Sequence, residues 1–389
     1  MTTFAFDRWQ RAEAWVGLGV ASVESPTLVI DLDAMERNLA RMSEFARARG
    51  LRLRPHAKMH KSAELALLQM AHGAVGVCVQ KTDEALALAQ GGVNNIYISN
   101  EVIAPAKLQR LADAVRAHRT RFAIAVDSLQ GIDALAAALA HAGVDQPDAI
   151  DVFIEIDVGH GRCGVPPGDA AVALAQRLAG QPALRFAGLQ AYHGSAQHHR
   201  AHSERTAAVA SAADAVKQTL QALSAHGFEA PLITGAGTGT FLNEAALGVW
   251  GELQCGSYLF MDADYARNEA TPDAPGFEHA LFVKSQVTSR AAAHAVCDAG
   301  HKSHAIDSGL PTVAFPAGLS FANGGDEHGV LRSTGNSKGL PALGETVWLV
   351  PGHCDPTVNL HDFMVGVRGG LAAGVVERIV RVDARGGVG

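Results

Sequence analysis

Short apolar runs alternate with helical patterns along the first two thirds of the chain. Each run ends in polar or glycine residues, and the intervals between runs repeat apolar residues at helical spacing, as in 204–226. Such an alternation predicts a (β/α)8 barrel, because neighbouring parallel strands need a crossover long enough for a helix. The eight runs are 52–58, 76–81, 96–100, 121–128, 151–159, 186–194, 232–237 and 252–260.

After residue 264 the pattern changes to strand-like runs separated by glycine turns, which predicts a second, mainly β domain. An additional apolar run at 27–33 precedes the barrel, and we expect it to pair with the C-terminal sheet. Asp33 is then expected to cap a helix over 34–49. The predicted parts are an N-terminal segment (1–35), a barrel (36–264) and a β domain (265–389). The strand-like runs of the last part are 281–287, 294–300, 347–350 and 363–368.

Composition narrows the class of protein. The chain has 389 residues, 48% of them hydrophobic, and a net charge of −7 without a basic run, which argues against a nucleic-acid partner. No apolar stretch reaches the roughly 20 residues of a membrane span, and the first residues do not resemble a signal peptide. The five cysteines are odd in number and lack CxxC spacing, which is typical of reduced thiols. We therefore expect a cytoplasmic protein.

Lys58 is the first candidate for chemistry. It follows the first barrel run, and Pro55 disfavours helix just before it, so Lys58 is expected at the carboxyl end of a strand, where barrel enzymes keep their active sites. The cationic neighbours Arg54, Lys61 and His56 are expected to lower the pKa of its amine and make it a nucleophile. The alternative is a basic surface cluster.

Two further segments suggest contacts to an anion. The turn 234–240 is rich in glycine and threonine and follows the seventh run, where barrels often bind phosphate, although it matches neither the dinucleotide fingerprint nor the P-loop. Arg162 follows the fifth run, and its guanidinium can hold a phenolate or a carboxylate. The alternative for Arg162 is a structural salt bridge to Asp157.

His353 and Asp355 form half of a candidate metal site. In an extended segment these two side chains would point to the same side, and Cys354 would point away. One imidazole nitrogen and one carboxylate oxygen suit a divalent cation whose other ligands are water or substrate oxygens.

A set of motifs, in order along the chain, resembles the family of D-threonine aldolases and 3-hydroxy-D-aspartate aldolases. These are pyridoxal phosphate enzymes of the alanine racemase fold (fold type III), a barrel followed by a β domain, and the resemblance implies a homodimer. The motifs are RPHAKMHK (54–61), VCVQK (77–81), ISNEV (98–102), GRCGV (161–165), LQAYHGS (189–195), ELQCGSY (252–258), DEHG (326–329) and PGHCDPT (351–357).

The resemblance implies a role for each candidate residue. Lys58 would bind the cofactor covalently, His193 would be the catalytic base, and His353 with Asp355 would bind the metal, with manganese expected before magnesium, cobalt or zinc. The substrate would be a small D-3-hydroxy amino acid, such as D-threonine or D-phenylserine, cleaved to glycine and an aldehyde. The implied cofactor contacts are Gln80, Arg162, Tyr192, Gly237, Thr238, Gly239, Gln254, Ser257 and Tyr258, with Gln254 facing the pyridine nitrogen.

Other activities stay open at the level of the sequence. The substrate could instead be 3-hydroxy-D-aspartate, which would give glycine and glyoxylate. A dehydratase of the D-serine type shares the fold but resembles a His-x-Cys metal pattern, so Asp355 favours the aldolase. A metal-dependent barrel hydrolase without pyridoxal phosphate is the alternative from another class of enzyme.

Overall fold

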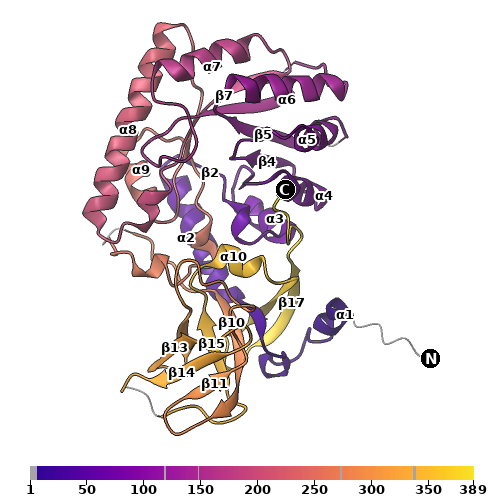
Figure 1. The fold of residues 1–389 in the computed structure, drawn as a ribbon, viewed down its shortest axis with the longest axis vertical. Coiled ribbons are helices and arrows are strands. Elements are labelled where there is room, and N and C mark those ends of the chain that lie inside the picture. The colour runs from indigo at the N-terminus through magenta and orange to yellow at the C-terminus, as the bar shows by residue number, and fades with distance from the viewer. Residues whose placement is uncertain (1–6, 118–119, 148, 272–273, 336–338) are drawn as a thin grey trace, which may run out of the picture.

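The computed structural model describes residues 7–117, 120–147, 149–271, 274–335 and 339–389. A barrel surrounded by helices forms one end of the molecule, and a β domain forms the other (Figure 1). No helix within the described ranges is long and apolar enough to cross a bilayer.

Each of the eight predicted runs overlaps a strand, although three strands begin one or two residues earlier, so the predicted barrel is confirmed. Its parallel sheet has the order β2-β9-β8-β7-β6-β5-β4-β3. The ring closes between β2 and β3, because Cys78 N donates to Pro55 O at 2.8 Å and Val75 N donates to Leu53 O at 2.9 Å. The strands are β2 (Arg52–Leu53), β3 (Val77–Val79), β4 (Asn95–Ile98), β5 (Arg121–Val126), β6 (Ile150–Glu155), β7 (Leu184–Ala191), β8 (Ile233–Gly235) and β9 (Glu252–Leu253).

Helices pack around the barrel, and capping side chains set where several of them begin. Ser128 Oγ accepts from Gly131 N at 3.2 Å at the start of α6. The predicted cap of the first long helix was wrong by two residues. That helix begins at Leu32, and Asp31 Oδ1 accepts from Ala34 N at 3.1 Å, whereas Asp33 pairs with Arg368. The barrel helices are α2 (Leu32–Ala48), α3 (Ala63–Ala71), α4 (Thr82–Gln90), α5 (Pro105–Ala117), α6 (Leu129–His141), α7 (Asp169–Ala179), α8 (His202–Ala225) and α9 (Phe241–Leu247).

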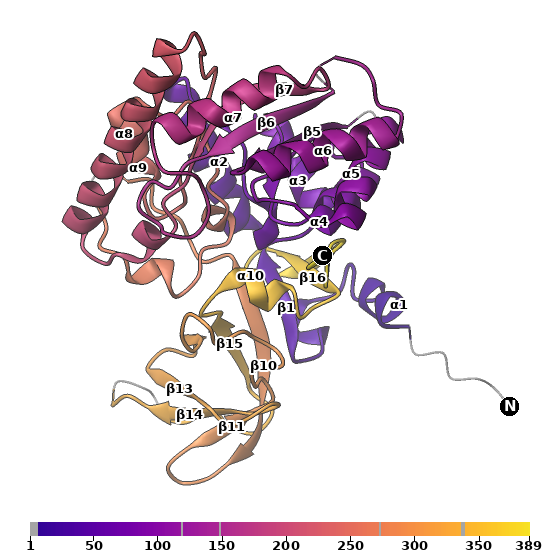
Figure 2. The ribbon, with the colours of Figure 1, turned by 45° about the horizontal axis from the view of Figure 1, so that its top comes forward.

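The β domain is a nine-stranded sheet that takes one strand from the N-terminal segment. β1 lies between β10, with which it pairs antiparallel, and β16, with which it pairs parallel (Figure 2). The predicted runs correspond to β10, β11, β15 and β16, and four further strands were not predicted. The strands are β1 (Thr27–Asp31), β10 (Leu281–Arg290), β11 (Ala295–Cys297), β12 (Thr312–Phe315), β13 (Leu319–Asn323), β14 (Gly329–Ser333), β15 (Thr346–Val350), β16 (Phe363–Arg368) and β17 (Val375–Arg381).

Two further α-helices are short, α1 (Arg8–Glu13) and α10 (Cys354–Val358), and five 3₁₀ turns lie in the loops of the described residues. One apolar core fills the space between the barrel strands and helices α4 to α8. A second core joins α2 and the end of β9 to the β domain, through residues such as Met35, Leu253, Tyr258 and Val283. This second core holds the segment after β9 against the β domain, next to α10. All five cysteines are free thiols.

Candidate active site

A cavity of about 240 Å³ opens at the carboxyl ends of the barrel strands and is closed on one side by the start of α10. Nine of the residues predicted for the site line it together: Lys58, Gln80, Arg162, Tyr192, Gly237, Thr238, Gln254, Ser257 and Asp355. They come from loops after six different barrel strands and from the β domain. The barrel therefore gathers residues that are far apart in the sequence, as parallel strands of one barrel must.

Lys58 lies on a short 3₁₀ turn after β2 and is 39% exposed, toward the cavity. Its Nζ donates to the carboxylate of Asp355, which reaches it from α10. Burial is the largest single effect and lowers the pKa of Lys58, but the charge and hydrogen bond of Asp355, together with Tyr192 and Glu84, outweigh it, so the pKa is raised. The predicted lowering of this pKa was wrong.

The neighbouring cations do not repel Lys58 as expected, because each has its own carboxylate. Arg54 Nε lies 3.0 Å from Glu252 Oε1, and Lys61 Nζ lies 3.1 Å from Glu84 Oε1. Burial keeps the pKa of His56 well below its usual value. His56 is therefore neutral, and its Nε2 accepts from the Gln80 amide at 3.0 Å.

The glycine-rich turn presents a set of free donors to the cavity. The Thr238 hydroxyl accepts from Tyr258 N at 3.0 Å, so its own proton is available to an acceptor in the cavity. In the described part of the chain, no protein acceptor pairs with the backbone N–H of Gly237, Thr238 or Ser257. Unpaired N–H groups that converge on one place form a cradle for an anion.

Arg162 lines the same cavity. Its guanidinium lies 5.9 Å from the centre of the Tyr192 ring. Asp157, the alternative partner considered for Arg162, accepts instead from the backbone N–H groups of Gly159 and Gly161, at 2.9 and 3.0 Å. Arg162 is thus available to an anionic group inside the cavity.

His353 and Asp355 face each other, but not for the reason expected. The segment is not extended: α10 begins at Cys354, and His353 is its N-cap residue. His353 Nε2 lies 3.8 Å from Asp355 Oδ1, a buried oxygen without a hydrogen-bond partner in the described residues. Asp307 accepts from His353 Nδ1 at 2.7 Å, which turns Nε2 toward Asp355. Burial lowers the pKa of His353, but the surrounding carboxylates of Asp355, Asp307 and Asp262 outweigh it, so the pKa is raised.

Cys354 points away from this pair, as predicted. Its side chain is fully buried, and its Sγ lies 3.5 Å from Met261 O. Among the described side chains, no group of three or more His, Cys, Asp or Glu residues is arranged to hold a metal ion. A cation at His353 and Asp355 would therefore take its other ligands from water or substrate.

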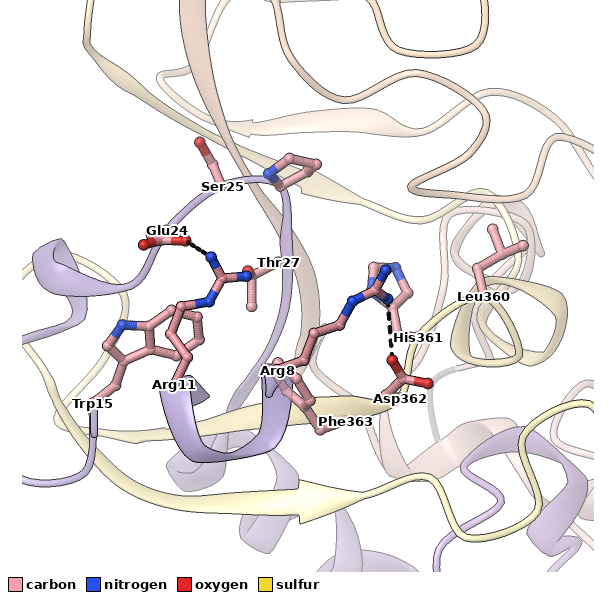
Figure 3. Close-up of a pocket in the computed structure, with 11 residues that line it drawn as sticks. Arg8, Arg11, Trp15, Glu24, Ser25, Thr27, Leu360, His361, Asp362 and Phe363 are labelled. Atoms are coloured by element: carbon pink, nitrogen blue, oxygen red, sulfur yellow. Dashed lines mark hydrogen bonds and ion pairs between the residues drawn. The ribbon is translucent and has the colours of Figure 1, made fainter. Parts of the chain in front are cut away.

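A different cavity, of about 430 Å³, lies between α1, the start of β1 and the segment 360–363 that follows α10 (Figure 3). Its two arginines are paired: Arg8 Nη1 lies 3.2 Å from Asp362 Oδ2, and Arg11 Nη1 lies 2.8 Å from Glu24 Oε2. Because each arginine of this cavity is paired with a carboxylate, neither is left for an anionic ligand. We therefore place the candidate active site in the cavity around Lys58.

Comparison with known proteins agrees with this placement. The model of the alanine racemase N-terminal domain matches residues 30–264, and that of a putative serine dehydratase domain matches 280–367. A D-threonine aldolase of Arthrobacter sp. is 44% identical over 94% of both chains. A 3-hydroxy-D-aspartate aldolase of Paracoccus denitrificans is 42% identical over 95% of this chain and 94% of its own. The chain belongs to this aldolase family. The crystal structure of the D-threonine aldolase from Filomicrobium marinum has a TM-score of 0.91 and 48% identity, and covers 96% of this chain and 99% of that chain.

Four residues predicted for an aldolase site do not line the cavity: His193, Gly239, Tyr258 and His353. Tyr258 is fully buried, and its hydroxyl accepts from Gln69 at 3.1 Å. Gly239 N donates to Gln197 Oε1 at 2.9 Å, so this amide is used within the protein. His353 contacts Asp355, which lines the cavity, but does not line it itself.

His193 is buried beside His160, whose ring centre lies 6.5 Å away. Its Nδ1 accepts from Ala196 N at 3.4 Å and lies 3.3 Å from Ser195 Oγ. Burial and the neighbouring His160 lower its pKa, so it is neutral near pH 7 and able to take up a proton. Its role as the base of the aldolase stays a prediction.

Several residues of the aldolase cavity were not predicted: His56, Met59, Ser99, Gln190, Ala236, Gly256 and Tyr265. Gln190 precedes Tyr192 by two positions, and the period of a strand could have found it. Asp307, which orients His353, lies in an irregular loop, and no pattern in the sequence links the two. The tertiary fold brings Asp307 to His353, which is 46 residues further along the chain.

Proposed function

We propose that this chain is a pyridoxal phosphate-dependent and divalent-metal-dependent aldolase, which cleaves D-3-hydroxy amino acids of the D-threonine or D-phenylserine type to glycine and an aldehyde. One observation carries the proposal: a lysine, a cradle of free donors and the carboxylate of Asp355 line a single cavity, and His353 lies next to that carboxylate. Sequence identity of 44% to a D-threonine aldolase supports it.

The residues of the cavity fit pyridoxal phosphate. Lys58 would attach to the aldehyde carbon, the N–H groups of Gly237, Thr238 and Ser257 would hold the phosphate, and Arg162 would face the 3-oxygen. When bound, the cofactor supplies an electron sink for the pair of electrons that the broken Cα–Cβ bond leaves on Cα.

The His353 and Asp355 pair fits a divalent metal. The imidazole Nε2 that Asp307 orients and an unpaired, buried Asp355 oxygen are the two donors it needs, and a bound cation would take the place of the Nε2 proton. Asp355 is ionised, since Lys58 and His353 hold its pKa at about 2 although burial opposes them. One nitrogen and hard oxygens favour manganese, with magnesium, cobalt or zinc as alternatives, and such an ion supplies a Lewis acid for the substrate 3-hydroxyl.

Residues of the chain would then position and deprotonate the substrate. Asp355 contacts both Lys58 and His353, so it would hold the metal next to the amine. We assign proton removal from the 3-hydroxyl to His193, which is neutral and directly follows the cavity residue Tyr192.

The first experiment is binding of pyridoxal phosphate to the purified chain, followed by borohydride reduction and peptide mapping. We expect the reduced cofactor on Lys58. Glycine and acetaldehyde from D-threonine, but not from L-threonine, would then establish the reaction. A protein that binds no cofactor but hydrolyses an ester or amide with added metal would instead be a barrel hydrolase.

A second substrate is supported by one observation. A relative of 42% identity is named a 3-hydroxy-D-aspartate aldolase, so 3-hydroxy-D-aspartate is the second candidate substrate. Arg162, whose guanidinium lines the cavity, is a cation that could contact its second carboxylate. Turnover of D-threonine, D-phenylserine and D-3-hydroxyaspartate, measured side by side, distinguishes the two aldolases.

Elimination of water, as in a dehydratase, is the remaining alternative. A D-threo-3-hydroxyaspartate dehydratase of Delftia sp. is 33% identical over 62% of this chain. Formation of ammonia and a keto acid in place of glycine would identify it. We also propose that the chain acts in the cytoplasm and forms a homodimer, and sedimentation velocity tests the latter.

A further inference from the structure

A buried hydrogen-bond network lies under the cavity and ends at Gln254. Arg54 and Glu252 form its base, with side chains that are 6% and 0% exposed. The Glu252 carboxylate accepts from Arg54 Nε at 3.0 Å and from Arg52 Nε at 3.1 Å, and a carboxylate in such ion pairs only accepts hydrogen bonds. The Thr234 hydroxyl, 2.9 Å from Glu252 Oε1, must therefore be the donor. The only proton of that hydroxyl is used in this bond.

This order of donors and acceptors fixes the side-chain amide of Gln254. Thr234 Oγ1 can only accept from Gln254 at 2.8 Å, so the group that faces it is the NH₂ group, Nε2. The same Nε2 donates to Gln190 Oε1 at 2.7 Å, and Gln190 Oε1 also accepts from Tyr97 at 3.0 Å. Both N–H bonds of Gln254 are thus engaged within the protein, and the carbonyl Oε1 is left for the cavity that Gln254 lines.

We infer that Gln254 presents a hydrogen-bond acceptor to the ring nitrogen of pyridoxal phosphate, so that the bound cofactor keeps this nitrogen protonated. The inference rests on the proposed function, because it requires the cofactor in this cavity. Gln254 follows β9 and stands just before Gly256 and Ser257, at the edge of the donor cradle. An acceptor at this place stabilises the N–H form of the ring, whereas a donor would stabilise the form without the proton.

Protonation of the ring nitrogen has a chemical consequence. A protonated ring withdraws electrons more strongly, which favours the electron pair left on Cα after bond cleavage. Thr234 and Gln190 are positioning residues in this scheme, because they hold Gln254 and reach the cofactor only through it. Gln190 is the competing group, since its own NH₂ would be a donor if it faced the ring instead.

The test is the chemical shift of the ring nitrogen. Pyridoxal phosphate labelled with ¹⁵N in the ring is bound to the full chain, and the ¹⁵N resonance is followed from neutral to alkaline pH. We expect the upfield shift of a pyridinium ion in the wild type and in Gln254→Glu, and the downfield shift of free pyridine in Gln254→Met. Thr234→Val should lower the pH at which the resonance moves. Gln109→Met, a surface control on α5, should behave as the wild type.

The outcomes separate this inference from the proposed function. Absence of cofactor binding and of a borohydride adduct on Lys58 would refute the proposed function itself. A cofactor that is bound to Lys58 but has an unprotonated ring nitrogen would overturn the inference, and recovery of the pyridinium shift in Gln190→Met would assign the donor role to Gln190. A pyridinium shift that persists in Gln254→Met would overturn it as well. If Gln254→Met does not fold, Gln254→Glu and Thr234→Val carry the test.

Discussion

Replacement of Arg54 by Met should destabilise the barrel, because it leaves the Glu252 carboxylate without its buried partner. Arg54 Nε lies 3.0 Å from Glu252 Oε1, and Arg54 Nη1 donates to Asn95 Oδ1 at 2.7 Å. Removal of one member of a buried ion pair costs about 3–5 kcal/mol. Arg52 Nε lies 3.1 Å from Glu252 Oε2 and, in the variant, would still partly neutralise the buried carboxylate. We therefore expect a loss at the lower end of that range.

A loss of about 3 kcal/mol corresponds to more than a hundredfold in the unfolding equilibrium, since about 1.4 kcal/mol is tenfold. Urea unfolding followed by tryptophan fluorescence measures it, because Trp250 is buried in the barrel and donates to Ala191 O at 3.0 Å. Arg52→Met is the matched control. Arg52 is 47% exposed, and its removal should cost no more than about 1 kcal/mol.

A double-mutant cycle separates loss of the pair from loss of packing. Arg54→Met combined with Glu252→Gln should be more stable than the sum of the two single effects implies, because no buried charge then lacks a partner. Equal free energies of unfolding for Arg54→Met and Arg52→Met would refute the reasoning. So would a double variant whose loss is the simple sum of the single losses.

Further predictions concern the site. Lys58→Ala should abolish covalent attachment of the cofactor and cleavage, and a borohydride adduct formed elsewhere in that variant would refute the assignment. His193→Ala should retain the cofactor but lose about 10²–10⁴-fold in cleavage rate, measured by aldehyde release, as expected for a general base; a rate within about twofold of wild type would argue against that role. Chelation should stop cleavage without releasing the cofactor, and manganese should restore it. Asp355→Ala should mimic chelation and Cys354→Ser should change little, whereas the opposite ranking would favour a thiolate metal site. Glu155 is 4% exposed, and burial raises its pKa from 4.5 to about 9. Between pH 4.5 and about 9, Glu155 therefore keeps a proton in the native state that it has lost in the unfolded state. The free energy of unfolding should fall as the pH rises through this window. Urea unfolding as a function of pH should show a weaker dependence for Glu155→Gln, and identical pH profiles would contradict it.

The barrel was predictable because its strands are buried on both faces. Strands such as β5 and β6 read as continuous apolar runs, which a sequence shows directly. The strands that were missed, including β12 and β13, are only four or five residues long and partly exposed, so they do not form a long buried apolar run. Periodicity alone does not distinguish such segments from loops.

The members of the site were more predictable than their electrostatics. The position of Lys58 followed from a strand end, but the direction of its pKa shift did not, because Asp355 comes from 297 residues further along the chain. The pairing of His353 with Asp355 was expected from an extended segment and is produced instead by the first turn of α10. The contact between Lys58 and Asp355 depends on how the barrel and the β domain pack together, and the local sequence around either residue does not predict that packing.

The central place of β1 determines the order in which the molecule can be completed during synthesis. Leu28 and Ile30 leave the ribosome early, yet their partners lie in β10 and β16, after the whole barrel has been made. Until then β1 has two unpaired edges and an apolar surface, the condition in which strands associate with other chains. The barrel is therefore an insertion between the first strand of a sheet and the rest of it. A fragment that ends after the barrel would retain β1 without either neighbour, whereas a circular permutant that joins β1 to the C-terminal strands would make both domains continuous.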